Sequence, residues 1–241
     1  MSWAAHDLEP YAIQRHLGGK VAIVPLLIGS YSPDMFSKWF VYGIDVLGLE
    51  LKADNPVQFH RGWPGVGFTH SLAFGLVVAA MILLLTRSRV WAFSFLLGHW
   101  AHALTDVGDT IGTMLAFPFS TETFGIGAWA YAGQTDRLTD AGAYFSGLGF
   151  VWDGVWVVYG LLCWRILTRE YFREVIVKAD PRFWGFAGRW LPETALLALY
   201  RASFFYGSTR WVAWLIWAHL IHDYPFDLSW GGPDWVPAAH D

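Results

Sequence analysis

The sequence is poor in cysteine and in charged residues, and each shortage excludes a class of protein. Cys163 is the single cysteine among 241 residues, so neither a disulfide framework nor a thiolate metal site is expected. Charged residues make up 15% of the chain, against about 25% in a typical soluble domain. The first ten residues contain no Lys or Arg, so no cleavable signal peptide is expected. The net charge of −4 is small and dispersed, which argues against a nucleic-acid partner.

Apolar and aromatic residues are abundant instead. They account for 55% and 18% of the chain, the mean hydropathy is +0.35, and the sixteen Trp are typical of membrane interfaces. We therefore predict an all-α, polytopic integral membrane bundle of about five membrane segments, formed by residues 1–241 as a single membrane domain. The lipid bilayer is then its expected partner. The expected segments are 11–31 (a short span or a re-entrant helix), 72–85, 90–106, 144–164 and 211–224.

The distribution of basic residues predicts an orientation. Residues 165–210 hold eight of the sixteen Lys and Arg, so this segment is expected in the cytoplasm, with an interfacial helix over 191–205. The N-terminus is then inside, together with His6 and His16. Most of the other histidines, including His70 and His102, gather at the outer face.

A polar stripe crosses one of the most apolar stretches of the chain. His99, His102 and Asp106 are spaced by three and four residues, so they share one face of a helix, and Asp109 extends the stripe. His70 and Asp106 each lie about 18 residues from the turn at 87–89, which places them at similar depth on two antiparallel helices. Such a stripe needs partners, either a metal ion or a hydrogen-bonded polar seam between helices.

These motifs resemble a known family in their order. The proline-aspartate at Asp34, the His60-Arg61-Gly62 and Thr69-His70-Ser71 elements, and His102 with Asp106 are similar to the YdjM-type inner-membrane proteins, which are thought to be metal-dependent hydrolases. The resemblance covers residues 12–120. In this chain residues 63–68 separate elements that are nearly contiguous in the family, Asp109 replaces a threonine, and Phe117 replaces a tryptophan.

The resemblance implies a divalent metal, zinc or alternatively manganese. The metal ligands expected are His70, His102 and Asp106, with His60 and Asp34 as further ligands or supporting groups. A phosphoester or lipid-like substrate would be hydrolysed at the outer face of a bacterial inner membrane, in a multi-pass protein. Asp106 or Asp109 would orient the attacking water, and Arg61 would hold the anion or else extend to the membrane interface.

Two other functions remain open from the sequence. The chain could be an accessory subunit of a larger membrane complex, retaining an inactive hydrolase-like motif. It could also carry haem or chlorophyll on transmembrane histidines, although carboxylates on the same stripe argue against this. His99 is expected to support the site or pack in the core. Asp153 is expected to pair with an Arg or His of another helix, and His219, His222 and Asp223 are expected to be structural.

Overall fold

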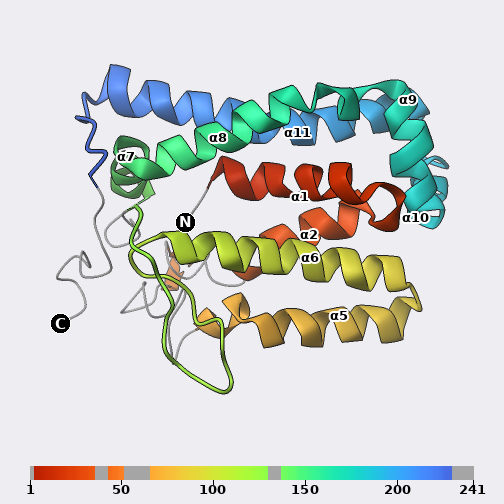
Figure 1. Ribbon diagram of the computed structural model, residues 1–241, viewed down its shortest axis with the longest axis horizontal. Coiled ribbons are helices and arrows are strands. Elements are labelled where there is room, and N and C mark those ends of the chain that lie inside the picture. Colours follow the sequence, from red (N-terminus) through yellow and green to blue (C-terminus); the bar gives the residue numbers. More distant parts are fainter. Residues whose placement is uncertain (1–2, 36–42, 52–65, 130–136, 230–241) are drawn as a thin grey trace.

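The computed structural model describes residues 3–35, 43–51, 66–129 and 137–229, and within these ranges the chain is mainly helical (Figure 1). The first helix, α1 (Ala4–Leu17), lies at the centre, between α8 (Leu148–Leu162) and α11 (Glu193–Ile216) on one side and α2 (Ile23–Met35) and α6 (Arg89–Thr105) on the other. α5 (Leu72–Thr86) packs on the outer side of α6. Most of α1 is therefore buried, including its ionisable residues His6, Asp7 and Glu9.

Shorter elements complete the described chain. A two-stranded antiparallel sheet, β1 (Ile44–Val46) and β2 (Leu49–Leu51), follows α2. α7 (Arg137–Ser146) precedes α8, whereas α9 (Arg169–Tyr171) and α10 (Pro181–Ala187) lie at the opposite end of the molecule. The remaining 3₁₀ and π segments are η1 (Gly18–Lys20), η2 (Val66–His70), η3 (Asp106–Gly108), η4 (Trp164–Leu167), η5 (Phe172–Val177) and η6 (Trp217–Ile221).

The N-terminus of α1 is capped by a side chain from another helix. The Asp153 carboxylate of α8 accepts hydrogen bonds from Ala5 N at 2.9 Å and Trp3 N at 3.2 Å. It thereby satisfies N–H groups that have no partner within the helix and adds negative charge at the positive end of the helix dipole. Asp153 was expected to pair with an Arg or His of another helix. Its carboxylate does contribute to raising the pKa of Arg210 on α11, and the hydrogen bonds described here add the backbone at the start of α1 as a partner.

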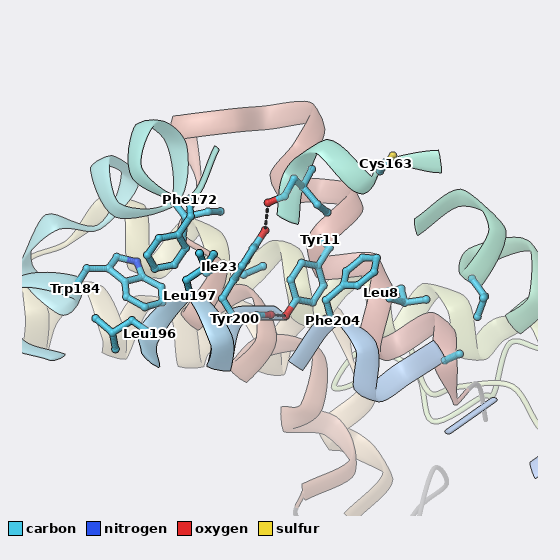
Figure 2. Close-up of a cluster of buried hydrophobic side chains, with 14 residues drawn as sticks. Leu8, Tyr11, Ile23, Cys163, Phe172, Trp184, Leu196, Leu197, Tyr200 and Phe204 are labelled. Atoms are coloured by element: carbon cyan, nitrogen blue, oxygen red, sulfur yellow. Dashed lines mark hydrogen bonds between the residues drawn. The ribbon is translucent and has the colours of Figure 1, made fainter. Parts of the chain in front are cut away.

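The main apolar core forms where α1 meets α11 (Figure 2). Leu8 and Tyr11 of α1 pack there against Tyr200 and Phe204 of α11. Both tyrosine hydroxyls have acceptors, because Tyr11 donates to Tyr200 O and Tyr200 donates to Ile166 O, each at 3.2 Å. This core therefore buries aromatic surface without leaving either phenol unsatisfied.

α2 and α6 touch at their backbones. A Cβ atom built on Gly29 would lie 2.1 Å from Phe95 O, and one built on Gly98 would lie 2.1 Å from Leu26 O. No side chain larger than hydrogen fits at either position unless the helices move apart. This close approach fixes the spacing between the helices that carry Asp34 and His102.

The prediction of a polytopic membrane bundle is wrong, because the helices that it required to span the membrane are not present among the described residues. None of the described helices combines the length and the apolar character that crossing a membrane requires. α5 is the most apolar stretch, but its 15 residues extend about 22 Å at about 1.5 Å per residue, against about 30 Å of hydrocarbon. α11 is longer, with 24 residues, but it contains Glu193, Arg201 and Arg210.

Helix boundaries explain the other differences. The segment predicted at 11–31 is broken, because Gly18 adopts φ +57° and ends α1 before α2 begins. The expected interfacial helix at 191–205 and the start of the last predicted span form one continuous helix, α11. Its residues Leu196, Tyr200 and Phe204 pack into the core against α1. The helical hairpin predicted on either side of residues 87–89 is present as α5 and α6.

Candidate metal centre

Four side chains from separate segments converge at one end of the central helices. Asp34 stands in the last turn of α2, His70 ends η2, His102 lies in the last turn of α6, and Asp106 begins η3. His102 and Asp106 are neighbours because they are four residues apart, and α6 passes into η3 between them. Both histidines and Asp106 are buried, and Asp34 is 14% exposed.

The separations of the ligand atoms suit one ion between them. His102 Nε2 lies 3.4 Å from Asp106 Oδ2 and 3.8 Å from Asp34 Oδ1. His70 Nε2 lies 3.6 Å from each of the same two oxygens. Ligand atoms about 2.1 Å from a single tetrahedral ion are about 3.4 Å apart. All four atoms lie within 4.8 Å of one another, so the group could hold a divalent metal ion.

The state of His102 agrees with a ligand role. Neither of its ring nitrogens has a hydrogen-bond partner among the described residues, although both are buried. Burial lowers the pKa of His102 to about 4, and the neighbouring His6 acts in the same direction. At neutral pH the imidazole is therefore uncharged, which is the form that binds metal ions.

His6 belongs to this site, although the sequence analysis placed it on the opposite side of a membrane. Its Nε2 lies 3.1 Å from Asp106 Oδ1, and its ring stacks on His102 with 3.7 Å between the centroids. Burial alone would lower the pKa of His6, but the carboxylates of Asp106 and Glu9 outweigh it and raise the pKa to about 9. His6 therefore donates a proton to Asp106 Oδ1, while Oδ2 of the same carboxylate faces the other ligands.

Glu9 extends this arrangement along α1. Its Oε2 lies 3.8 Å from His6 Nδ1, and its Oε1 accepts a hydrogen bond from Thr105. The spacing of His6, Asp7 and Glu9 next to an apolar stretch was a signal in the sequence. It was missed because the first ten residues were considered only for the Lys and Arg that a signal peptide requires.

Other candidates from the sequence have different surroundings. His60 and Arg61 lie outside the described residues, so their predicted roles stay predictions. Asp109 is buried, and its Oδ1 accepts hydrogen bonds from Ile111 N at 3.0 Å and Gly112 N at 2.7 Å, which shapes the loop after η3. Its proposed part in catalysis is not tested by these contacts.

Three other described histidines, His16, His99 and His219, make contacts of a structural kind. His99 Nε2 contacts Ser71 O at 3.1 Å, which links α6 to the start of α5. His219 contacts two backbone carbonyls, those of Phe145 and Tyr224, at 2.8 Å each. His16, at the far end of α1, bonds to Tyr159 of α8.

A second buried polar cluster lies beside the candidate metal centre. Asp7 Oδ2 is 2.8 Å from Arg210 Nη2, and Tyr31 donates to Asp7 Oδ1 at 2.5 Å. Arg210 also donates to Trp3 O. Burial raises the pKa of Asp7, and the guanidinium of Arg210 and the Tyr31 hydroxyl oppose this rise. We call Asp7, Tyr31 and Arg210 the Asp7 cluster.

Comparisons with known proteins give one match. No curated protein and no solved structure matches the chain. A family model described as YdjM inner membrane protein matches residues 5–172, a range that contains Asp34, His70, His102 and Asp106 as well as His6. The resemblance inferred over residues 12–120 is thereby confirmed and extended at both ends, and the chain belongs to the YdjM family of inner membrane proteins.

Proposed function

We propose that this protein is a metal-dependent hydrolase that acts on a phosphoester or lipid-like substrate at a bacterial inner membrane. The observation that carries the proposal is the convergence of Asp34, His70, His102 and Asp106 from α2, η2, α6 and η3. Two imidazoles and two carboxylates without thiolate suit zinc, and manganese is the alternative. The family's description as an inner membrane protein supports the location.

The chemistry proposed is the addition of water across a phosphoester bond. The water oxygen forms a bond to phosphorus, the bond from phosphorus to the ester oxygen breaks, and a proton goes to the departing oxygen. A divalent metal, when bound, would lower the pKa of a coordinated water and neutralise charge on the phosphoryl group.

The protein's own groups would set the geometry of this reaction. His6 holds Asp106 through Oδ1, which keeps Oδ2 directed at the cluster. Its protonated ring is also a proton source close to the ligands. Arg61 would hold the anionic substrate, His60 would complete or support the ligand set, and Asp109 would orient water through the loop it shapes.

Metal content tests the site directly. We expect about one equivalent of zinc or manganese in the purified wild-type protein by elemental analysis, and a stoichiometric loss in His102→Ala and in Asp106→Asn. His99→Ala is the matched control, because it removes another buried histidine from the same helix outside the cluster. Equal metal content in His102→Ala and the wild type would contradict the proposal.

Hydrolysis is tested separately from metal binding. Metal-loaded protein in vesicles is assayed for phosphate release from phosphatidic acid and for cleavage of a water-soluble phosphodiester. We expect turnover in the wild type and background in Asp106→Asn. If the metal is present and neither substrate is cleaved faster than by Asp106→Asn, the metal site stands and the hydrolase assignment for these phosphoesters falls.

A further inference from the structure

An apolar cavity of about 540 Å³ lies between α1, α6 and α8. This volume is in the usual range for sites that hold small molecules, about 300–1,000 Å³. Val155 is 56% exposed, so the cavity reaches the protein surface at this point. The lining residues are Ala12, Ile13, His16 and Leu17 of α1, Leu97 of α6, and Trp152, Val155, Trp156 and Tyr159 of α8.

The lining offers almost nothing to a polar ligand. The polar side-chain groups of the lining residues are those of His16 and Tyr159, which pair with each other by a hydrogen bond, and the indole N–H groups of Trp152 and Trp156, which are buried. None of the described residues that form the wall is Lys, Arg, Asp or Glu. A charged or sugar-like molecule would lose its hydration here without replacement hydrogen bonds, whereas a hydrocarbon chain would gain free energy for every buried methylene.

The cavity follows the same face of α1 as the candidate metal centre. Ile13 is seven residues, or about two turns, beyond His6, so both side chains leave the helix in nearly the same direction about 10 Å apart. Glu9 lies between them and is bonded to Thr105 of α6. The cavity therefore lies about two turns of α1 away from the metal centre, on the same face of that helix.

Two tryptophans link the cavity wall to the η3 segment of the metal centre. Trp152, in the cavity wall, stacks on Trp129 with 5.8 Å between ring centroids. The Trp129 ring lies directly against Gly108, since a Cβ atom on that glycine would come within 2.1 Å of it. Gly108 is two residues beyond Asp106 and belongs to the same η3 segment. The cavity wall is thus linked to the segment that carries a candidate metal ligand through one intervening ring, that of Trp129.

We infer that this cavity binds a fatty acyl chain of the substrate, while the phosphoester head group of the same molecule lies at the metal centre. The inference rests on the proposed hydrolase function and narrows its substrate class to phospholipids or other long-chain phosphoesters. The position of the cavity on the metal-centre face of α1 and its apolar wall are the observations that carry it.

Photolabelling tests the inference on the full-length protein in phosphatidylcholine vesicles. The probe is phosphatidic acid with a diazirine near the end of one acyl chain, and labelled peptides are mapped by mass spectrometry. We expect labelling of residues 12–17 and 152–159 well above that of Leu84 and Leu85, which are exposed on α5 and report general lipid contact.

Filling the cavity provides a matched comparison. Val155→Trp places a large ring at the cavity wall, whereas Val158→Trp makes the same change on the same helix at a residue that is also 56% exposed but does not line the cavity. We expect labelling to fall about tenfold in Val155→Trp, equivalent to about 1.4 kcal/mol, and to stay unchanged in Val158→Trp. Ile13→Trp should reproduce the loss if Val155→Trp folds poorly.

The outcomes separate this inference from the proposed hydrolase activity. Labelling of the cavity that survives in Asp106→Asn supports a chain-binding site independently of metal and turnover. Labelling no stronger than at Leu84 and Leu85, or equal labelling in Val155→Trp and Ile13→Trp, would overturn the inference even if the wild type binds metal and hydrolyses a soluble phosphodiester.

Discussion

His6 and Asp7 are adjacent in the sequence, yet they enter two buried polar clusters of different character. Asp7 meets a full positive charge at 2.8 Å and a hydroxyl at 2.5 Å, the distances of short, formed polar contacts. His6 joins a group in which the nitrogen-to-oxygen separations across the candidate ligands are 3.4–3.8 Å. These exceed the usual 2.7–3.2 Å of a hydrogen bond and match the spacing of ligands around one ion.

The comparison of the two clusters shows that buried charged groups on one helix can either hold helices together or prepare a site for a metal ion. In the Asp7 cluster the charges neutralise each other, so the cluster binds α1 to α2 and α11 without any added component. In the candidate metal centre, two imidazole nitrogens and two carboxylate oxygens face one another, and all four are atoms that can coordinate a cation. Substitutions in the first cluster should therefore change stability alone, and substitutions in the second should change metal binding.

The largest expected effect is on stability, in Arg210→Gln. Removing the guanidinium leaves the Asp7 carboxylate buried without its counter-charge, which costs about 3–5 kcal/mol of unfolding free energy. Thermal unfolding should show a large decrease in midpoint, and metal content per folded molecule should be unchanged. The double variant Asp7→Asn/Arg210→Gln should recover part of the loss. A double variant as unstable as the single one would contradict a charge-based explanation.

The stability of Arg210→Gln should also depend on pH. Burial raises the pKa of Asp7 in the folded protein above that in the unfolded chain, and removal of Arg210 strengthens this rise. The folded state then binds a proton more tightly than the unfolded state, so stability falls as pH rises from the ordinary range of aspartate through the raised folded-state pKa. The difference from wild type should be larger at pH 8 than at pH 5. The same difference at both pH values would exclude this account.

A smaller loss of stability is expected in Tyr31→Phe. The variant removes the hydroxyl that donates to Asp7 Oδ1, and hydrogen bonds to charged groups are worth about 1.5–3 kcal/mol. Tyr31 is only three residues from Asp34 on α2, so unchanged metal content in this variant would sharpen the separation of the two clusters. Tyr206→Phe, at an exposed tyrosine of α11, is the control. Loss of metal in Tyr31→Phe would show that the clusters are coupled.

The smallest effect in free energy is expected in His6→Gln, and it should appear in metal affinity. His6 positions Asp106 through Oδ1, and loss of such a supporting contact costs about 10–100-fold in affinity. A titration against a chelator of known affinity measures the change. His219→Gln removes a histidine bonded to backbone carbonyls elsewhere and should leave affinity unchanged. Unaltered affinity in His6→Gln would contradict the positioning role.

The sequence was informative about the site where the spacing of residues was local. His102 and Asp106 lie one helical turn apart, and the hairpin of α5 and α6 brings His70 beside them, so the stripe and the turn were enough to group these three. His6 could not be placed in this way, since its contact with Asp106 spans 100 residues. An orientation derived from the predicted membrane segments then assigned it to the wrong face.

The sequence predicted that the fold is helical, but it placed the ends of several helices wrongly. Apolar composition marked α5, α6 and α8 correctly as helical stretches, but composition does not show that Gly18 ends α1 or that α11 continues past Arg201. Those boundaries depend on backbone conformation and on packing against α1. The predicted length of each apolar segment was therefore unreliable, and the inference of membrane-spanning segments failed with it.

The central position of α1 has a consequence for the order of folding. Residues in and next to α1 are buried in the middle, and their partners come much later in the chain: Asp153 lies 150 residues after Trp3, Tyr200 lies 189 after Tyr11, and Arg210 lies 207 after Trp3. Contacts so distant in sequence form slowly, because long loops must close first. During synthesis Asp7 therefore lacks the counter-charge of Arg210 until α11 has been made and has packed against α1.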